Sequence, residues 1–79
     1  MDVRPRYSKV LEIRVKVKYD PEVDILRIIL NDAPVEESDE SRPGVILDFD
    51  ASGNVVGFEV LDASKRVGDP TSVEYAIEQ

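Results

Sequence analysis

The stretch that decides the fold runs from residue 43 to residue 61, PGVILDFDASGNVVGFEVL. Two runs rich in β-branched and aromatic residues, 45–50 and 55–61, flank a four-residue segment that contains Gly53 and Asn54. This pattern is typical of a β-hairpin. Pairing Asp50 with Asn54 would mix polar and apolar side chains on each face. Pairing Asp50 with Val55 predicts a consistent core face, with the aligned pairs Phe49–Val56, Leu47–Phe58 and Val45–Val60.

A second hairpin is predicted upstream. Residues 10–19 alternate strictly between apolar and polar side chains, as a half-buried strand does. Asp20-Pro21-Glu22 interrupts this pattern, and a second apolar run covers residues 23–30. Joining the apolar residues predicts the pairs Val17–Leu26, Val15–Ile28 and Ile13–Leu30. This register places Lys16 opposite Arg27, which weakens it, because like charges directly across a sheet repel.

The second run, 23–30, is apolar on both sides of the pleat, so another element must cover its reverse side. Residues 31–42, NDAPVEESDESR, are acidic and contain a proline and two serines. They predict a solvated connection, with a short edge strand around Val35–Ser38 as the alternative.

The C-terminal part predicts short helical structure. Asp62 is the expected cap of one helical turn, Ala63 to Arg66, and Gly68 is suited to end it. The later sequence Thr71-Ser72-Val73-Glu74 matches a capping box, which predicts a second short helix reaching Gln79. Such a helix is marginal alone and needs an apolar surface. The patch of Ile25, Ile29 and Ile46 is the expected dock, and the same patch on a second copy is the alternative.

These elements predict an α+β fold: a four-stranded antiparallel β-meander with a short C-terminal helical segment. Residues 1–9 form a basic N-terminal arm in this interpretation, and residues 10–79 form a single small domain. One packed sheet face gives little core at 79 residues. We therefore expect a homodimer that buries the reverse face or an edge.

The composition excludes several kinds of catalytic and metal-binding site. The chain has neither cysteine nor histidine, so disulfides, thiolate nucleophiles, histidine acid–base relays and Cys/His zinc sites are excluded. We expect no catalytic residue and no cofactor. The net charge of -7 argues against nucleic acid as a partner. No segment predicts membrane insertion, which points to a cytoplasmic protein. The charge is uneven: residues 1–19 are basic, and residues 20–62 carry twelve acids against two arginines.

One stretch resembles a metal site. Asp48-Phe49-Asp50-Ala51-Ser52-Gly53, followed by five residues and then Glu59, fits the twelve-residue calcium-loop spacing, with serine at the fifth position. A true calcium loop of that kind lies between two helices, whereas both flanks here alternate as strands. The remaining expectation is a hydrated divalent cation held loosely by Asp48, Asp50 and Glu59.

An ordered set of short motifs also carries a family resemblance. It comprises Tyr19-Asp20-Pro21-Glu22, Asp24, Leu30-Asn31-Asp32-Ala33-Pro34-Val35, the run 43–50, Gly53, the run 56–61 and Asp62-Ala63-Ser64-Lys65. Over roughly residues 15–67 the chain resembles the small prokaryotic proteins of domain-of-unknown-function family DUF2283. The resemblance implies a compact antiparallel sheet with a helical turn after the last strand. It brings no assigned reaction or ligand. It also suggests a place beside small toxin-like genes, with the protein as the neutralising partner.

Three functions follow as hypotheses. The first is a non-catalytic protein-interaction module, antitoxin-like in its relation to a small toxin and suited by its acidic middle to a basic protein partner. The second is a weak divalent-cation binder at Asp48, Asp50 and Glu59. The third, ranked last, is a small enzyme that uses paired carboxylates.

Overall fold

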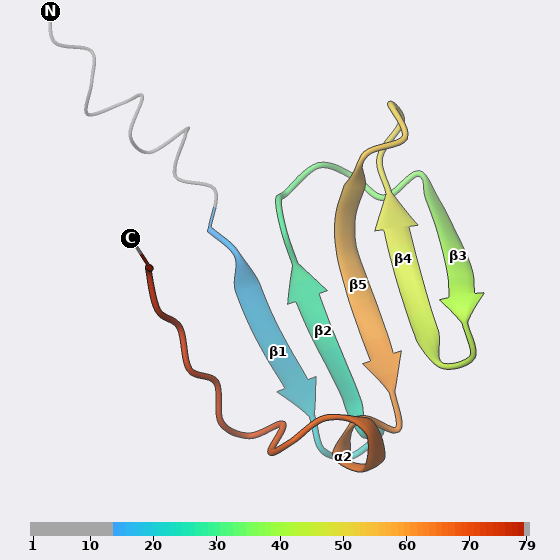
Figure 1. Ribbon diagram of the computed structural model, residues 1–79. Coiled ribbons are helices and arrows are strands. Elements are labelled where there is room, and N and C mark those ends of the chain that lie inside the picture. Colours follow the sequence, from blue (N-terminus) through green and yellow to red (C-terminus); the bar gives the residue numbers. More distant parts are fainter. Residues whose placement is uncertain (1–13, 79) are drawn as a thin grey trace, which may run out of the picture.

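The computed structural model describes residues 14–78. They form a five-stranded antiparallel sheet in the order β1-β2-β5-β4-β3, followed by one short helix (Figure 1). The elements are β1 (Lys16–Asp20), β2 (Ile25–Ile29), β3 (Glu37–Arg42), β4 (Val45–Phe49), β5 (Val55–Leu61) and α2 (Ala63–Arg66). The predicted arm at residues 1–9 and the start of the first predicted strand, 10–13, lie outside the described residues.

The antiparallel sheet with a short helix is confirmed, but the four-stranded meander is wrong. After β2 the chain does not turn back into an adjacent strand. It crosses to the far edge of the sheet, and β5 later returns between β2 and β4 (Figure 1). The crossing is held where the amides of Leu30 and Asn31 both donate to the carbonyl of Val56, at 2.8 and 3.3 Å. This order gives β2, which is apolar on both sides, a strand partner at each edge.

The fifth strand is β3, whose sequence ESDESR is exposed throughout. The acidic connection predicted for residues 31–42 therefore contains a six-residue edge strand, which begins at Glu37 and not near Val35. A bulge lies between Glu40 and Arg42. Charged side chains and bulges are devices that keep an exposed edge from pairing with other chains, so an edge position suits this sequence.

The hairpin of β1 and β2 forms with a register two residues away from the predicted one. Val17 pairs with Ile28 and Tyr19 with Leu26, because β1 continues to Asp20 and a four-residue turn precedes Ile25. The like-charge pair persists in a new form, with Lys18 opposite Arg27. Glu59 lies on the other side of Arg27 and accepts a 3.1 Å hydrogen bond from its Nε, which offsets the repulsion.

The hairpin of β4 and β5 has most of the predicted register. Val45 pairs with Val60 and Leu47 with Phe58 as expected. A register shift between Asp48 and Phe49 then sets Phe49 opposite Val55 instead of Val56. Bulges of this kind bend the strand and strengthen its twist. The predicted core face therefore holds in the middle of the hairpin and changes only at its tip.

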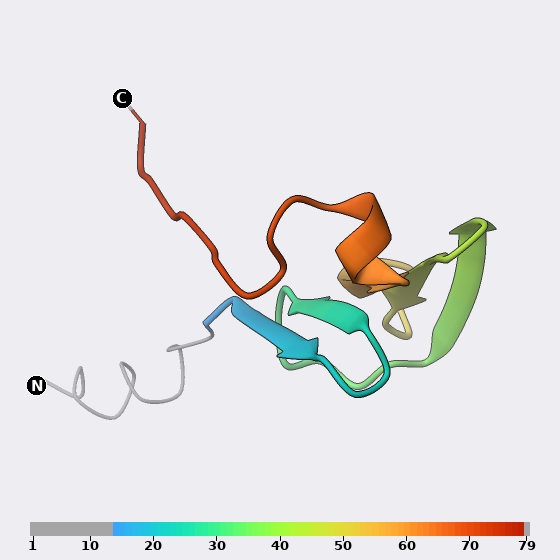
Figure 2. The same ribbon diagram turned by 90° about the horizontal axis from the view of Figure 1, so that it is seen from below.

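The sheet has two different faces, because alternate side chains in paired strands point the same way. We call one the apolar face: Val17, Tyr19, Leu26, Ile28, Val45, Leu47, Phe58 and Val60. We call the other the mixed face: Lys16, Lys18, Ile25, Arg27, Ile29, Ser38, Glu40, Ile46, Asp48 and Glu59. Figure 2 places α2 and the C-terminal segment on the same side of the sheet. Val73 there lines a hollow with Val17 and Tyr19, which identifies that side as the apolar face.

The helical turn Ala63–Arg66 is confirmed, but its predicted cap is not. Asp62 adopts a left-handed conformation with φ 53° and makes no side-chain capping bond. The second helix predicted over Thr71–Gln79 is wrong for the described part, because residues 72–78 have no regular secondary structure. This segment also lies beside Val17 and Tyr19 and not on the predicted patch of Ile25, Ile29 and Ile46. Within residues 14–78, no helix has the length and hydropathy to span a membrane.

Candidate functional site

The three predicted cation ligands all lie in the β4–β5 hairpin, but each carboxylate has its own local partner. Asp48 accepts a 2.6 Å hydrogen bond from the hydroxyl of Ser38 on the neighbouring strand β3. Glu59 pairs with Arg27, with 3.1 Å between Nε and Oε2. Asp48 and Glu59 share the mixed face and line one hollow of about 340 Å³, together with Arg27, Asn31 and Asp32. The guanidinium in this hollow competes with a cation for Glu59.

Asp50 faces its own loop. Its Oδ1 accepts from the amides of Ser52 and Asn54, both at 2.9 Å, and its Oδ2 accepts from the Asn54 side chain at 3.4 Å. The backbone N–H of Asn54 contributes most to lowering the pKa of Asp50. This carboxylate orders the hairpin turn, as aspartates commonly do.

Among the residues from 14 to 78, no three acidic side chains gather closely enough to hold a metal ion. Weak binding at Asp48, Asp50 and Glu59 stays a prediction. It is tested by calorimetric titration with Ca²⁺ and Mg²⁺, repeated on the Asp50→Asn variant. Saturable heat that this substitution abolishes would support the site, and heat no larger than dilution would end it.

The carboxylate of Asp24, in the turn between β1 and β2, joins parts of the chain that are distant in sequence. Its Oδ1 accepts from the Tyr19 hydroxyl at 2.7 Å and from the Ser64 amide at 2.9 Å, and its Oδ2 accepts from the Ser64 hydroxyl at 2.7 Å. Its carbonyl accepts from the Ala63 amide at 3.0 Å. Asp24 thus caps α2 from a different part of the chain, which explains why Asp62 need not. We call Tyr19, Asp24, Ala63 and Ser64 the Asp24 junction.

The electrostatics of the Asp24 junction follow from these bonds. The Ser64 hydroxyl, and after it the Tyr19 hydroxyl, stabilises the ionised carboxylate and lowers the pKa of Asp24. The same bond to Asp24 raises the pKa of Tyr19, because loss of its proton would place two negative charges side by side. The Asp24 junction thus places two neutral hydroxyl donors, those of Tyr19 and Ser64, on one carboxylate anion. This arrangement fixes α2 in place, and the lowered pKa makes the Asp24 carboxylate a weak base toward the Ser64 hydroxyl.

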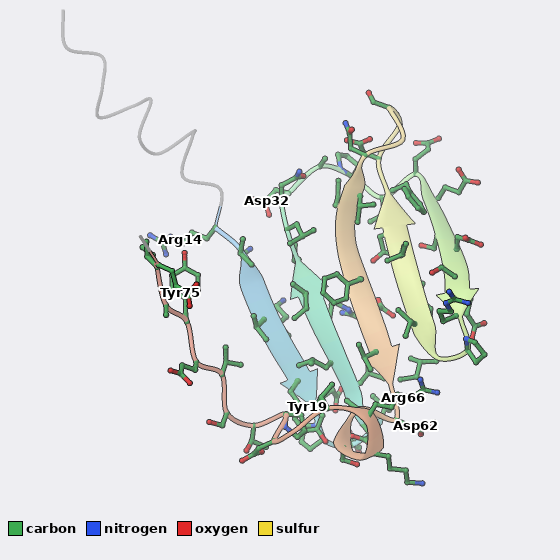
Figure 3. The ribbon with its side chains drawn as sticks, viewed as in Figure 1. Arg14, Tyr19, Asp32, Asp62, Arg66 and Tyr75 are labelled. Carbon is green, nitrogen blue, oxygen red and sulfur yellow. The ribbon has the colours of Figure 1, made fainter. Side chains whose placement is uncertain are left out.

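Sequence reasoning missed the Asp24 junction, although its parts were visible. Asp24 has φ 58°, a conformation that Asn, Asp and Gly tolerate best. Tyr19, Asp24 and Ser64 all stand among the motifs that carry the family resemblance. Their meeting depends on the β2–β5 pairing, which the predicted meander did not contain. Figure 3 shows Tyr19 at the end of the sheet beside α2, close to where β5 runs into the helix.

The apolar face is the other feature that suggests a function. In the described residues, the buried hydrophobic side chains are only Val56 and Ala63, at 2% and 0% exposure. The larger apolar side chains of β2, β4 and β5 are half-buried. Figure 1 shows α2 across one end of the strands and the C-terminal segment beside β1. The middle of the apolar face therefore lacks a second layer from residues 14–78.

Comparison with known proteins places the chain in a family of unknown function. The chain belongs to the family described as protein of unknown function (DUF2283), whose model matches residues 16–64. This range includes all five strands, Asp24 and Ser64. The chain is also similar to the uncharacterized protein MJ0789 of Methanocaldococcus jannaschii, with 36% identity over 53 residues. That match covers 67% of this chain and 45% of the relative. No solved structure matches the chain.

Proposed function

We propose that this chain is a non-catalytic protein-interaction module of the cytoplasm, and that another protein chain covers the apolar face of its sheet. The supporting observation is the apolar face, which α2 and the C-terminal segment cover only at one end and one edge. Leu26, Ile28, Leu47 and Phe58 stay half-buried there. Large apolar patches on a folded domain commonly mark protein contacts.

The charge distribution supports a basic partner. The outer strand β3 contributes Glu37, Asp39 and Glu40, and every residue of this strand is exposed. An acidic strand at an open edge attracts a positively charged chain and repels copies of itself. A second copy therefore belongs on the apolar face, whereas a basic protein belongs at the β3 edge. An antitoxin-like pairing with a small basic toxin is one form of this proposal.

Affinity capture from the native host tests the interaction. Tagged chain is used as bait at low ionic strength, and the captured proteins are compared with those from a bait in which Glu37 and Asp39 are both replaced by lysine. A bait with Glu74 and Glu78 replaced by lysine carries the same change in net charge at the other end of the molecule. We expect a basic protein that the first replacement loses and the second retains.

We expect the amount of captured basic protein to fall as the salt concentration rises, because exposed charges are screened within about 8–10 Å at 0.1–0.15 M ionic strength.

A direct genetic test is co-expression of this chain with any small basic reading frame beside its gene. The readout is growth of the host cells. Recovery of the free chain alone at every ionic strength, without growth protection, would overturn the basic partner.

A further inference from the structure

We propose that the C-terminal arm, residues 72–78, lies on the apolar face of a second copy, and that two copies exchange arms reciprocally. The inference rests on the proposed function in one respect, that another chain covers the apolar face. It adds the identity of that chain and the segment that makes the contact.

The arm is built like an unpaired strand. Figure 1 shows it as an extended run, and in such a run alternate side chains point to opposite sides. Val73, Tyr75 and Ile77 then share one side, and they are 62%, 84% and 77% exposed. Glu74 and Glu78 share the other side. Three large apolar residues at alternate positions form a surface that fits an apolar sheet face.

The arm runs along β1 of its own sheet, but most of its apolar surface stays exposed. Two open hollows of about 390 and 490 Å³ lie between it and β1, the first lined by Val17 and Val73 and the second by Arg14, Val15 and Tyr75. Val15 and Val17 stay 59% and 41% exposed. The arm therefore covers only part of β1, and Tyr75 and Ile77 stay largely exposed.

A turn sets the direction in which the arm leaves the domain. The amide of Thr71 donates to the Asp69 carboxylate at 2.9 Å, and the amide of Ser72 donates to the Asp69 carbonyl at 3.1 Å. The chain then runs along β1 and away from β5 and β4, on the side of the sheet that carries α2 (Figures 1 and 2). The open part of its own apolar face lies behind it, whereas a second copy placed beyond β1 lies ahead.

The dimensions suit an exchange. Seven extended residues span about 23 Å, which exceeds the roughly 17 Å length of a five-residue strand. Burying the apolar side of one arm removes roughly 400 Å² from water, since one aromatic side chain alone buries about 150–250 Å². With the area covered on the face, two equivalent contacts reach roughly 1,600 Å², the size of a standard specific interface. Reciprocal exchange closes at two copies, so it does not lead to fibres.

Cross-linking tests the contact directly, because the described residues hold no free cysteine and the full sequence has none. Three full-length single variants are prepared: Tyr75→Cys, Leu47→Cys on the apolar face, and Ile46→Cys on the mixed face of the same strand. We expect equimolar Tyr75→Cys and Leu47→Cys to form a disulfide-linked heterodimer under mild oxidation. The mixture of Tyr75→Cys with Ile46→Cys is the matched control and remains monomeric on a denaturing gel.

Sedimentation equilibrium measures the contribution of the arm. Replacing Tyr75 and Ile77 together by serine raises the dimer dissociation constant at least 100-fold, because central aromatic contacts dominate interface energies. Replacing Glu74 and Glu78 by glutamine, on the other side of the arm, changes it less than threefold. Circular dichroism confirms that each variant keeps its sheet.

The outcomes separate this inference from the proposed function. A dimer that persists in the serine variant, or equal cross-linking at Leu47 and Ile46, overturns the arm exchange and leaves the interaction module standing. A chain that is monomeric at every concentration also overturns the exchange, while capture of a basic protein still supports the proposed function. If no basic protein is captured while the exchanged dimer is intact, the basic partner is overturned and the arm exchange stands.

Discussion

The helix α2 and the C-terminal arm follow one another along the chain, but the first is helical and the second is extended. α2 has four residues and no side-chain cap from its own Asp62, yet it forms. The arm begins with a capping-box sequence at residues 71–74, yet residues 72–78 are extended. The difference is Asp24, which receives the first amides of α2 from 39 and 40 residues away in the chain. Tertiary contacts decide the structure of segments this short, because isolated short helices are unstable in water.

The largest effect is expected from separating β2 from β5, which together bring Asp24 to α2. A Cβ atom on Gly57 would lie 2.8 Å from the carbonyl oxygen of Ile28 on the adjacent strand. The backbone must move to relieve this contact. We expect Gly57→Ala to lower the free energy of unfolding by about 3 kcal/mol, as overpacking substitutions do. Chemical denaturation measures it.

The control for Gly57→Ala is Gly68→Ala, since an added Cβ at Gly68 has no neighbour within 4 Å and the residue follows α2. Its unfolding free energy stays within about 0.5 kcal/mol of the parent. Equal stability of the two variants would show that β5 tolerates displacement from β2, and the account of the Asp24 junction would then lose its basis.

The next effect concerns the Asp24 junction itself. Asp24→Ala removes the acceptor of Tyr19 and Ser64 and leaves a side chain that disfavours φ 58°. We expect the melting temperature to fall by roughly 5–15 °C, with loss of a helix cap as the main cause. Asp24→Gly separates the two causes, because glycine accepts the backbone conformation and also lacks the carboxylate. If the glycine variant recovers full stability, the hydrogen bonds of Asp24 contribute nothing.

The pH dependence of folding stability tests the contribution of the Asp24 junction. The pKa of Asp24 is lowered from 3.8, so its contribution to stability is complete above this value and is lost as the pH falls through the folded-state pKa. The pKa of Tyr19 is raised from 10.0, so its contribution is complete below pH 10 and is lost as the pH rises through the folded-state pKa. We therefore expect the stability difference between the parent and Asp24→Asn to shrink between pH 5 and pH 2.

Asp69, in the turn before the arm, provides the comparison with Asp24. Its pKa is also lowered, mainly by the hydroxyl of Thr71, but its bonds hold only the turn before the arm. Urea denaturation of Asp69→Asn should show a smaller difference from the parent at pH 7 than Asp24→Asn shows. A larger difference would mean that the arm is packed on its own domain more firmly than the hollows beside β1 indicate.

These residues also show what the sequence can predict. The middle of the β4–β5 hairpin was predictable because Leu47, Phe58, Val45 and Val60 align in one register. The turn Ala63–Arg66 was predictable as well. The bounds of β3 were not, because ESDESR lacks the apolar alternation that indicates a strand, and it forms through backbone pairing with β4. An edge strand there was only the alternative, around Val35–Ser38, so the predicted meander contained no crossing to a far edge.

The candidate site was harder to predict than the fold. Asp48, Asp50 and Glu59 were selected by spacing along the chain, but spacing does not include Ser38 or Arg27, which are their partners across strands. Ser38 lies in β3, a strand that the sequence offered only as an alternative and without its pairing to β4. The Asp24 junction joins residues 40 apart, and no local pattern reports such a contact. Carboxylates that look available in a sequence can thus already have partners in the fold.

The smallest expected effect compares two hydroxyl groups that each bond to an aspartate. Ser64→Ala removes the hydroxyl that donates to Asp24 across the fold, and Thr71→Ala removes the hydroxyl that donates to Asp69 two residues away. We expect a loss of about 1 kcal/mol for the first, because a hydrogen bond to a charged group that joins two elements is broken. We expect less than 0.5 kcal/mol for the second, in line with other surface substitutions. Urea denaturation and far-ultraviolet circular dichroism measure both, and a loss of helical signal in Thr71→Ala would show that the capping box forms a helix in solution.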